Sequence, residues 1–200
     1  MARLVFPVGQ FGGVVRGDSP TDVRFRIRRG NAVFTIEPEP GALWLAAHGR
    51  REKIATTEWT RDAVTRGRAP TDPVADGIRW GTLTGNGLIA EIDPNGAEAV
   101  EFARTHRLVP RMHGLGNRSE QPNVFMAGYA PDGVATFTWH QWRLWRESHL
   151  EPSLWDGCER QVENERRAGR RVDARFLLAD TLRGMHIMLG FQLAYLDVAR

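Results

Sequence analysis

Residues 23–49 read VRFRIRRGNAVFTIEPEPGALWLAAHG, and the fold class depends on this stretch. Its first seven residues alternate apolar and arginine side chains, which is the period-two pattern of a half-exposed β-strand. Gly30 and Asn31 mark a turn, and AVFTI (32–36) is the partner strand of a hairpin. The remainder is a short apolar helix that ends at Gly49. The stretch therefore predicts a mixed α+β unit.

The residues on either side extend the same unit. Upstream, RLVFPVG (3–9) predicts a strand, whereas FGGVVRGDSPTD (11–22) consists of turn-forming residues. Downstream, a second helix is expected over 58–67. A third apolar segment, 74–92, begins as a helix that its glycines weaken. The first half is thus expected to be three strands followed by three helices.

The second half repeats this order of strands and helices. The segments that carry the pattern are 97–109, 123–130, 134–139, 141–150, 154–167 and 173–198, the last predicted as one long helix. A shift of 104 residues places RLV (3–5) on RLV (107–109), which indicates an internal duplication. Chance alignment of two ordinary halves is the alternative. We predict two domains, 1–96 and 97–200.

Composition narrows the class of protein. The 200 residues are 42% hydrophobic and 26% charged, with a net charge of +3, which is typical of a folded globular chain. The single cysteine, Cys158, excludes an internal disulfide. The N-terminal residues lack the pattern of a signal peptide, and the most apolar stretch, 176–196, is interrupted by charged residues. We expect a cytoplasmic protein that does not bind membranes.

Two segments of the first half carry a resemblance to a known family. FTIEPEPGALWLAAHG (34–49) and LTGNGLIAEI (83–92) resemble the pyrroloquinoline-quinone peptide chaperone family and the related leader-peptide recognition elements of ribosomal peptide biosynthesis. The resemblance implies an α+β fold of two tandem winged-helix-like units, each a small antiparallel three-stranded sheet followed by three helices. The glycines between Gly81 and Gly87 depart from the family pattern, and the second half has Phe191 and Gln192 in place of its glycine-leucine close.

The same resemblance implies a function without catalysis. A peptide would add as a strand to the edge of the first three-stranded sheet, against the third helix, where unpaired backbone groups are available. The chain would then be an adaptor for a peptide or protein partner in a bacterial biosynthetic or assembly pathway.

Two sets of side chains are candidates for contacting such a partner. Arg24, Arg26 and Arg28 share one face of the predicted strand and suit an acidic peptide or a phosphate backbone. They could equally be the solvated face of a sheet, paired with acids such as Glu37. The tryptophans of the second half form the other set, namely Trp139, Trp142 and Trp145. They could be an exposed anchor or part of the core.

Two other classes of protein remain open at this stage. A winged-helix transcriptional regulator would bind DNA, and the pI of about 9.7 agrees with it, but the third helices offer few residues that read bases. An enzyme would need a site with no linear motif, because the six histidines have no metal-ligand spacing and Cys158 resembles a buried hydrophobe. We expect no catalytic residue, metal or cofactor.

A further arginine cluster, 166–171, is interpreted as a solvated helix face paired with nearby glutamates.

Overall fold

A computed structural model describes residues 2–17, 19, 22–66, 72–129 and 133–200. The fold is mixed α+β, which confirms the predicted class. The first half contains β1 (Leu4–Pro7), β2 (Gln10–Arg16), β3 (Val23–Arg29), β4 (Ala32–Ile36), α1 (Pro38–Ala46), the 3-10 helix η1 (Arg51–Lys53), α2 (Arg61–Thr65), α3 (Pro73–Gly85) and β5 (Ile89–Ile92). The second contains α4 (Ala97–Thr105), β6 (His106–Pro110), β7 (His113–Arg118), β8 (Gln121–Gly128), β9 (Gly133–Phe137), α5 (Trp139–Glu147), η2 (Ser148–Leu150), α6 (Leu154–Arg167), α7 (Ala174–Gly190) and β10 (Ala194–Val198).

The first three-stranded sheet is made of different strands from those predicted. Its order is β2-β3-β4, and β1 pairs instead with β5 in an antiparallel ribbon. The expectation that 11–22 only forms turns was wrong, because β2 occupies its first part. Gly12 and Gly13 accommodate a β-bulge between Phe11 and Gly13, where Gly13 has a φ of 100°, so they bend the strand and do not end it.

The second half has the same order of elements. The ribbon of β6 and β10 corresponds to that of β1 and β5, and β7-β8-β9 forms the second three-stranded sheet. The predicted helix over 173–198 is two elements, since α7 ends at Gly190 and β10 follows. The glycine-rich HGLGN (113–117), which contains turn-forming residues, lies in β7.

Helices α3 and α7 end in the same way. At the end of α3, Gly87 has a φ of 62° and Leu88 N–H donates to the Leu83 carbonyl at 2.8 Å. At the end of α7, Gln192 has a φ of 57° and Leu193 N–H donates to the Met188 carbonyl at 2.8 Å. These matching ends are separated by 105 residues (192 minus 87). The duplication and the two winged-helix units stay predictions, and this geometry supports the duplication.

Replacement of Gln192 by glycine is expected to stabilise the protein. Gln192 is the one non-glycine residue of the described chain with positive φ, a backbone conformation that a side chain disfavours. Glycine removes the backbone strain of the folded state, but it also raises the conformational entropy of the unfolded chain. The first contribution is the larger, so we expect a gain of about 0.5–1 kcal/mol in the free energy of unfolding. Gly87→Gln, the reciprocal change, is expected to lose about 1 kcal/mol. Urea denaturation measures both, and an equal or lower stability of Gln192→Gly would show that the glutamine side chain compensates its own strain.

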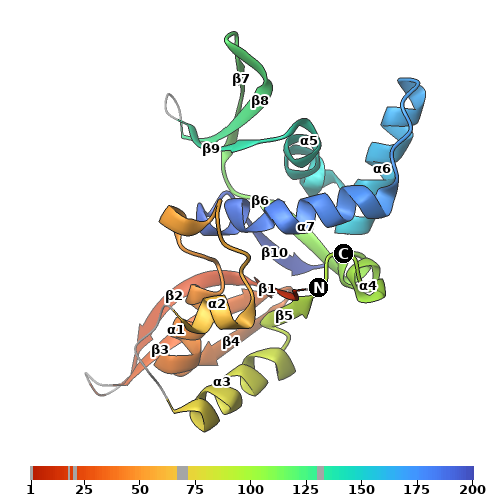
Figure 1. Ribbon diagram of the computed structural model, residues 1–200. Coiled ribbons are helices and arrows are strands. Elements are labelled where there is room, and N and C mark those ends of the chain that lie inside the picture. The colour runs from red at the N-terminus through yellow and green to blue at the C-terminus, as the bar shows by residue number, and fades with distance from the viewer. Residues whose placement is uncertain (1, 18, 20–21, 67–71, 130–132) are drawn as a thin grey trace.

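The two halves share packing across the predicted boundary. Helix α7 crosses the middle of the molecule, with β7, β8 and β9 on one side and the first sheet on the other (Figure 1). The imidazole of His186 on α7 contacts the Val5 carbonyl on β1 through Nε2 at 2.8 Å. Phe6 and Ile92 belong to the same hydrophobic cluster as the core of the second half. Within the described chain, no helix is long and apolar enough to cross a membrane.

Candidate functional site

The arginines of β3 share one face of the first sheet, as predicted. Register pairs Arg24 with Val15, Arg26 with Gly13 and Arg28 with Gln10. Strand β3 is the central strand, so β2 and β4 already use its backbone groups. An added strand can therefore bind only at β2 or β4.

These arginines differ in how they are paired. Arg24 forms ion pairs with Asp22 and Glu37, as expected for a solvated sheet face. Arg28 donates to the Tyr195 hydroxyl at 2.8 Å and lies 3.7 Å from the buried carboxylate of Asp197. These contacts attach β3 to β10.

Arg26 is the arginine of this face that is available to a partner. Its side chain is exposed, and no described residue forms an ion pair with it. The sheet face therefore carries one free positive charge at the centre of β3.

The tryptophans of α5 belong mainly to the core. Trp142 is 4% exposed and Trp145 is 1% exposed, so the interpretation of these two as an exposed anchor was wrong. Trp145 stacks on Phe137, and Trp142 packs at a tilt against Trp145, because α5 lies against the second sheet. Trp139 is 38% exposed, but Arg143 lies 5.3 Å above its ring.

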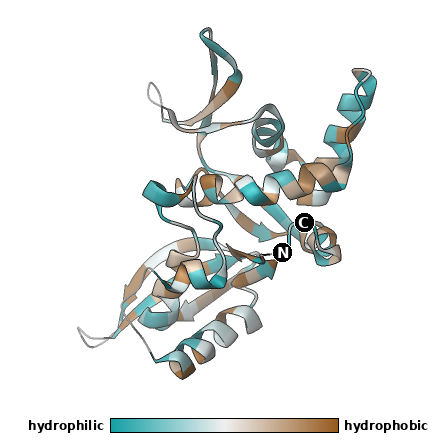
Figure 2. Ribbon diagram, viewed as in Figure 1, coloured by the Kyte–Doolittle hydropathy of each residue, from teal (hydrophilic) through white to brown (hydrophobic). Residues whose placement is uncertain are grey.

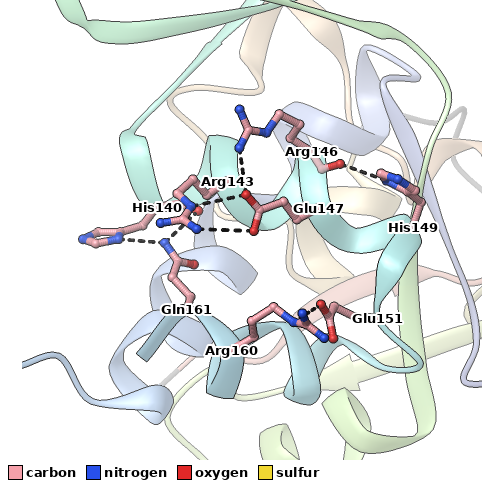
Figure 3. Close-up of polar contacts among 8 residues, drawn as sticks. All are labelled: His140, Arg143, Arg146, Glu147, His149, Glu151, Arg160 and Gln161. Carbon is pink, nitrogen blue, oxygen red and sulfur yellow. Dashed lines mark hydrogen bonds and ion pairs between the residues drawn. The ribbon is translucent and has the colours of Figure 1, made fainter. Parts of the chain in front are cut away.

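A group of polar and charged side chains lies between α5 and α6 (Figure 3). Glu147 contacts Arg146 and Arg143, and Glu151 pairs with Arg160. Burial alone would raise the pKa of Glu147, but the hydrogen bond from Arg146 and the charge of Arg143 hold it below the usual value. The cavity beside the cluster is only about 10 Å³, which leaves no room for a ligand. Within the cluster, Gln161 on α6 contacts His140 on α5 at 2.8 Å, and this contact joins the two helices.

The arginine cluster at the end of α6 is paired as predicted. Arg166 and Arg167 both contact Glu163, at 2.8 and 2.9 Å, and Arg170 pairs with Glu165. This end of α6 extends away from the rest of the molecule and is hydrophilic (Figure 2). It is a solvated helix end.

Strand β2 is an exposed edge with apolar side chains. Phe11 is 38% exposed, Val14 52% and Val15 37%. Gly17 N–H donates to the Asp22 carbonyl at 2.8 Å, so Gly17 and Asp22 form a hydrogen-bonded pair. Hydrogen-bonded pairs alternate with non-hydrogen-bonded pairs along two antiparallel strands, and the pair of Val14 and Phe25 is of the second kind. The N–H and C=O groups of Val14 therefore point away from β3. This edge is free to pair with another strand.

A pocket of about 160 Å³ lies where this edge meets the second half. Its walls come from the start of β2, the end of α1 and the segment that joins α7 to β10. The lining includes Gln10, Phe11, Trp44, Leu45, His48, Arg111, Gln192 and Tyr195. The sequence does not bring these residues together, since they are separated by up to 185 positions (195 minus 10).

The imidazole of His48 is neutral in this pocket. Burial lowers its pKa to about 4, although the hydrogen bond between Nδ1 and the Trp44 carbonyl at 3.1 Å acts in the opposite direction. The positive charge of Arg111 lowers the pKa further. Because a carbonyl only accepts, Nδ1 carries the proton. The pocket is thus polar, cationic at Arg111 and otherwise uncharged.

Other parts of the described chain show no reactive arrangement. Burial raises the pKa of the Cys158 thiol to about 12, so it is not a thiolate nucleophile at neutral pH. No group of three or more metal-ligating side chains occurs among the described residues. On α3, Arg79 is paired with Asp76, and Val74 and Ile78 are exposed.

No protein-family model, curated protein or solved structure matches the chain. The resemblance to peptide chaperones and leader-peptide recognition elements therefore stays a prediction.

The sequence signals for this site were weak. The glycines of β2 conceal its period-two pattern, and Arg111 and Gln192 lie in connections between elements with no motif around them. The one available signal was the end of the last helix, where the second half has Phe191 and Gln192 in place of Gly87 and Leu88. A residue that differs from the expected glycine at a helix end indicates either strain or a role for its side chain.

Proposed function

We propose that the protein is a non-enzymatic adaptor that binds an extended acidic peptide segment as an added antiparallel strand on β2. The observation that carries the proposal is the exposed β2 edge, with Phe11, Val14 and Val15 accessible and the Val14 backbone groups directed outward. An added strand satisfies these groups and buries the apolar side chains. Every sheet of the described chain is antiparallel, and an antiparallel partner extends this pattern.

The charges near this edge favour an acidic partner. Arg16 at the end of β2 is exposed, Arg26 lies on the neighbouring strand, and Arg111 lies in the pocket at the other end. No described carboxylate is paired with any of them. Acidic side chains on the bound segment would reach these guanidinium groups and raise the rate of association.

The resemblance identified in the sequence supports the same mode of binding. It implies strand addition at the first three-stranded sheet and a place in a bacterial biosynthetic or assembly pathway. The proposed binding position differs from the one that the resemblance implies, because we place the peptide on β2 and not against the third helix. The β2 edge carries more exposed apolar side chains than β4, where Val33 is the exposed large one.

The test removes the outward N–H of Val14. We expect Val14→Pro to weaken binding to octapeptides that alternate acidic and apolar residues by about tenfold or more, because proline has no N–H and its ring blocks the partner strand. Val14→Ala keeps the N–H and is the matched control, expected to bind within about threefold of the parent. Fluorescence anisotropy of labelled peptides measures both.

The fold is checked by thermal unfolding of each variant. The N–H of Val14 takes no part in pairing with β3, so proline at this edge position leaves the sheet intact. Should Val14→Pro fail to fold, Arg16→Pro tests the next outward N–H. Undiminished peptide binding by the folded proline variant would refute the proposal. Salt-sensitive binding of duplex DNA with no binding of any peptide would replace it with the regulator.

A further inference from the structure

Arg111 brings an uncompensated positive charge to the pocket between the halves. It follows β6, and its backbone N–H donates to the Leu193 carbonyl at 2.8 Å, which holds the residue beside the end of α7. Its guanidinium has no ion pair with any described residue. A guanidinium in such a position is a receptor for a carboxylate, which it can bind through two parallel hydrogen bonds.

Gln192 supplies a second reason to regard the pocket as a binding site. It has a φ of 57° where the equivalent end of α3 has a glycine, so the chain keeps a side chain at a position where glycine is less strained. The residue is exposed and lines the pocket with Gln10. The two carboxamides and Arg111 line the same pocket, and N–H donors together with a cation bind an anionic group.

The direction of an added strand brings its C-terminus to this pocket. An antiparallel partner of β2 has its N-terminal end near Arg16 and its C-terminal end near Gln10. Gly9 N–H already donates to the Leu196 carbonyl at 2.7 Å, so β10 occupies the position just before β2. The added strand must end where the pocket begins.

We propose that the pocket binds the terminal α-carboxylate of the peptide, so that the protein recognises the free C-terminus of its partner. Arg111 pairs with the carboxylate, and Gln10 and Gln192 donate hydrogen bonds to it. The last side chain of the peptide packs on Phe11 and Leu45 at the apolar wall. A volume of about 160 Å³ accommodates this terminal residue and excludes a longer continuation of the chain. The inference rests on the proposed function and specifies which end of the peptide is read.

The experiment compares one set of labelled acidic octapeptides in two forms, with a free C-terminal carboxylate and with a C-terminal amide. We expect the carboxylate form to bind the full chain about tenfold more tightly, because one charge-assisted contact is lost in the amide. Arg111→Gln is expected to remove the difference by weakening only the carboxylate form. Arg26→Gln is the matched control, expected to weaken both forms equally and to preserve the ratio.

The outcomes separate this inference from the proposed function. Equal binding of the two forms, or a ratio that persists in Arg111→Gln, would overturn the recognition of the C-terminus and leave strand addition intact. Absence of binding by either form would overturn both. A tenfold ratio that disappears in Arg111→Gln and persists in Arg26→Gln supports the inference.

Discussion

Acidification from pH 7 to pH 5 is expected to reduce the free energy of unfolding by about 4 kcal/mol, about 2 kcal/mol for each of His48 and His186. Burial lowers the pKa of both imidazoles to about 4, whereas the ordinary value is 6.5. Below pH 6.5 the unfolded chain binds protons at these residues and the folded chain does not. Stability is therefore complete above pH 6.5 and falls as the pH decreases toward 4.

His186→Gln separates the contribution of one histidine. His186 is 2% exposed, and its Nε2 lies 2.8 Å from the Val5 carbonyl, to which a glutamine N–H can also donate. Because glutamine does not titrate, we expect the loss between pH 7 and pH 5 to decrease by about half. His113 is exposed on β7, and His113→Gln is the control for replacing a histidine that makes no buried contact. Urea denaturation at pH 5, 6 and 7 measures the slopes, and a stability that stays constant over this range would contradict the prediction.

Truncation of a core tryptophan is the second large effect. Trp145→Ala and Trp44→Ala are each expected to cost about 3–5 kcal/mol in the free energy of unfolding, since both side chains are fully buried. Each indole also donates a hydrogen bond from Nε1 at 3.2 Å, from Trp44 to the Val8 carbonyl and from Trp145 to the Leu193 carbonyl. Trp44→Phe keeps most of the apolar contact and removes the indole donor to the Val8 carbonyl, at a cost of about 1–2 kcal/mol. Trp145→Phe is expected to cost less, because Arg111 N–H still donates to the Leu193 carbonyl.

The exposed tryptophan provides the control for this pair. Trp139→Ala is expected to cost less than either core variant, because its side chain is already partly in water. We expect one cooperative unfolding transition in every variant, since His186 and β1 join the two cores. Scanning calorimetry that resolved two transitions, with Trp44→Ala shifting one and Trp145→Ala the other, would instead show two independently folding halves.

The elements predicted correctly are those with local signals. Strands β3 and β4, the turn between them and α1 follow from 23–49, because alternation, turn residues and helix ends act within a few positions of the chain. Strands β5 and β10 escaped prediction for a different reason. Both are short apolar segments directly after an apolar helix, and periodicity alone does not distinguish a buried strand from the continuation of a helix.

The same distinction applies to the candidate site. The common face of Arg24, Arg26 and Arg28 could be read from the alternation of β3, but the pairing of Arg28 with Tyr195 depends on a contact across 167 positions. The burial of Trp142 and Trp145 likewise depends on where α5 packs. A local pattern indicates which side chains share a face and does not indicate what covers that face.

By itself the sequence determined the α+β class, the order of elements in 23–49 and the face that the β3 arginines share, because backbone preferences and side-chain periodicity are local properties. Only the tertiary structure decided that β1 pairs with β5 and β6 with β10, that β2 is an exposed edge, and that Arg111 and Gln192 line one pocket beside it. Each of these features requires segments that are far apart in the chain to meet. Their meeting is set by the burial of apolar surface over the whole molecule, which no single stretch of residues encodes.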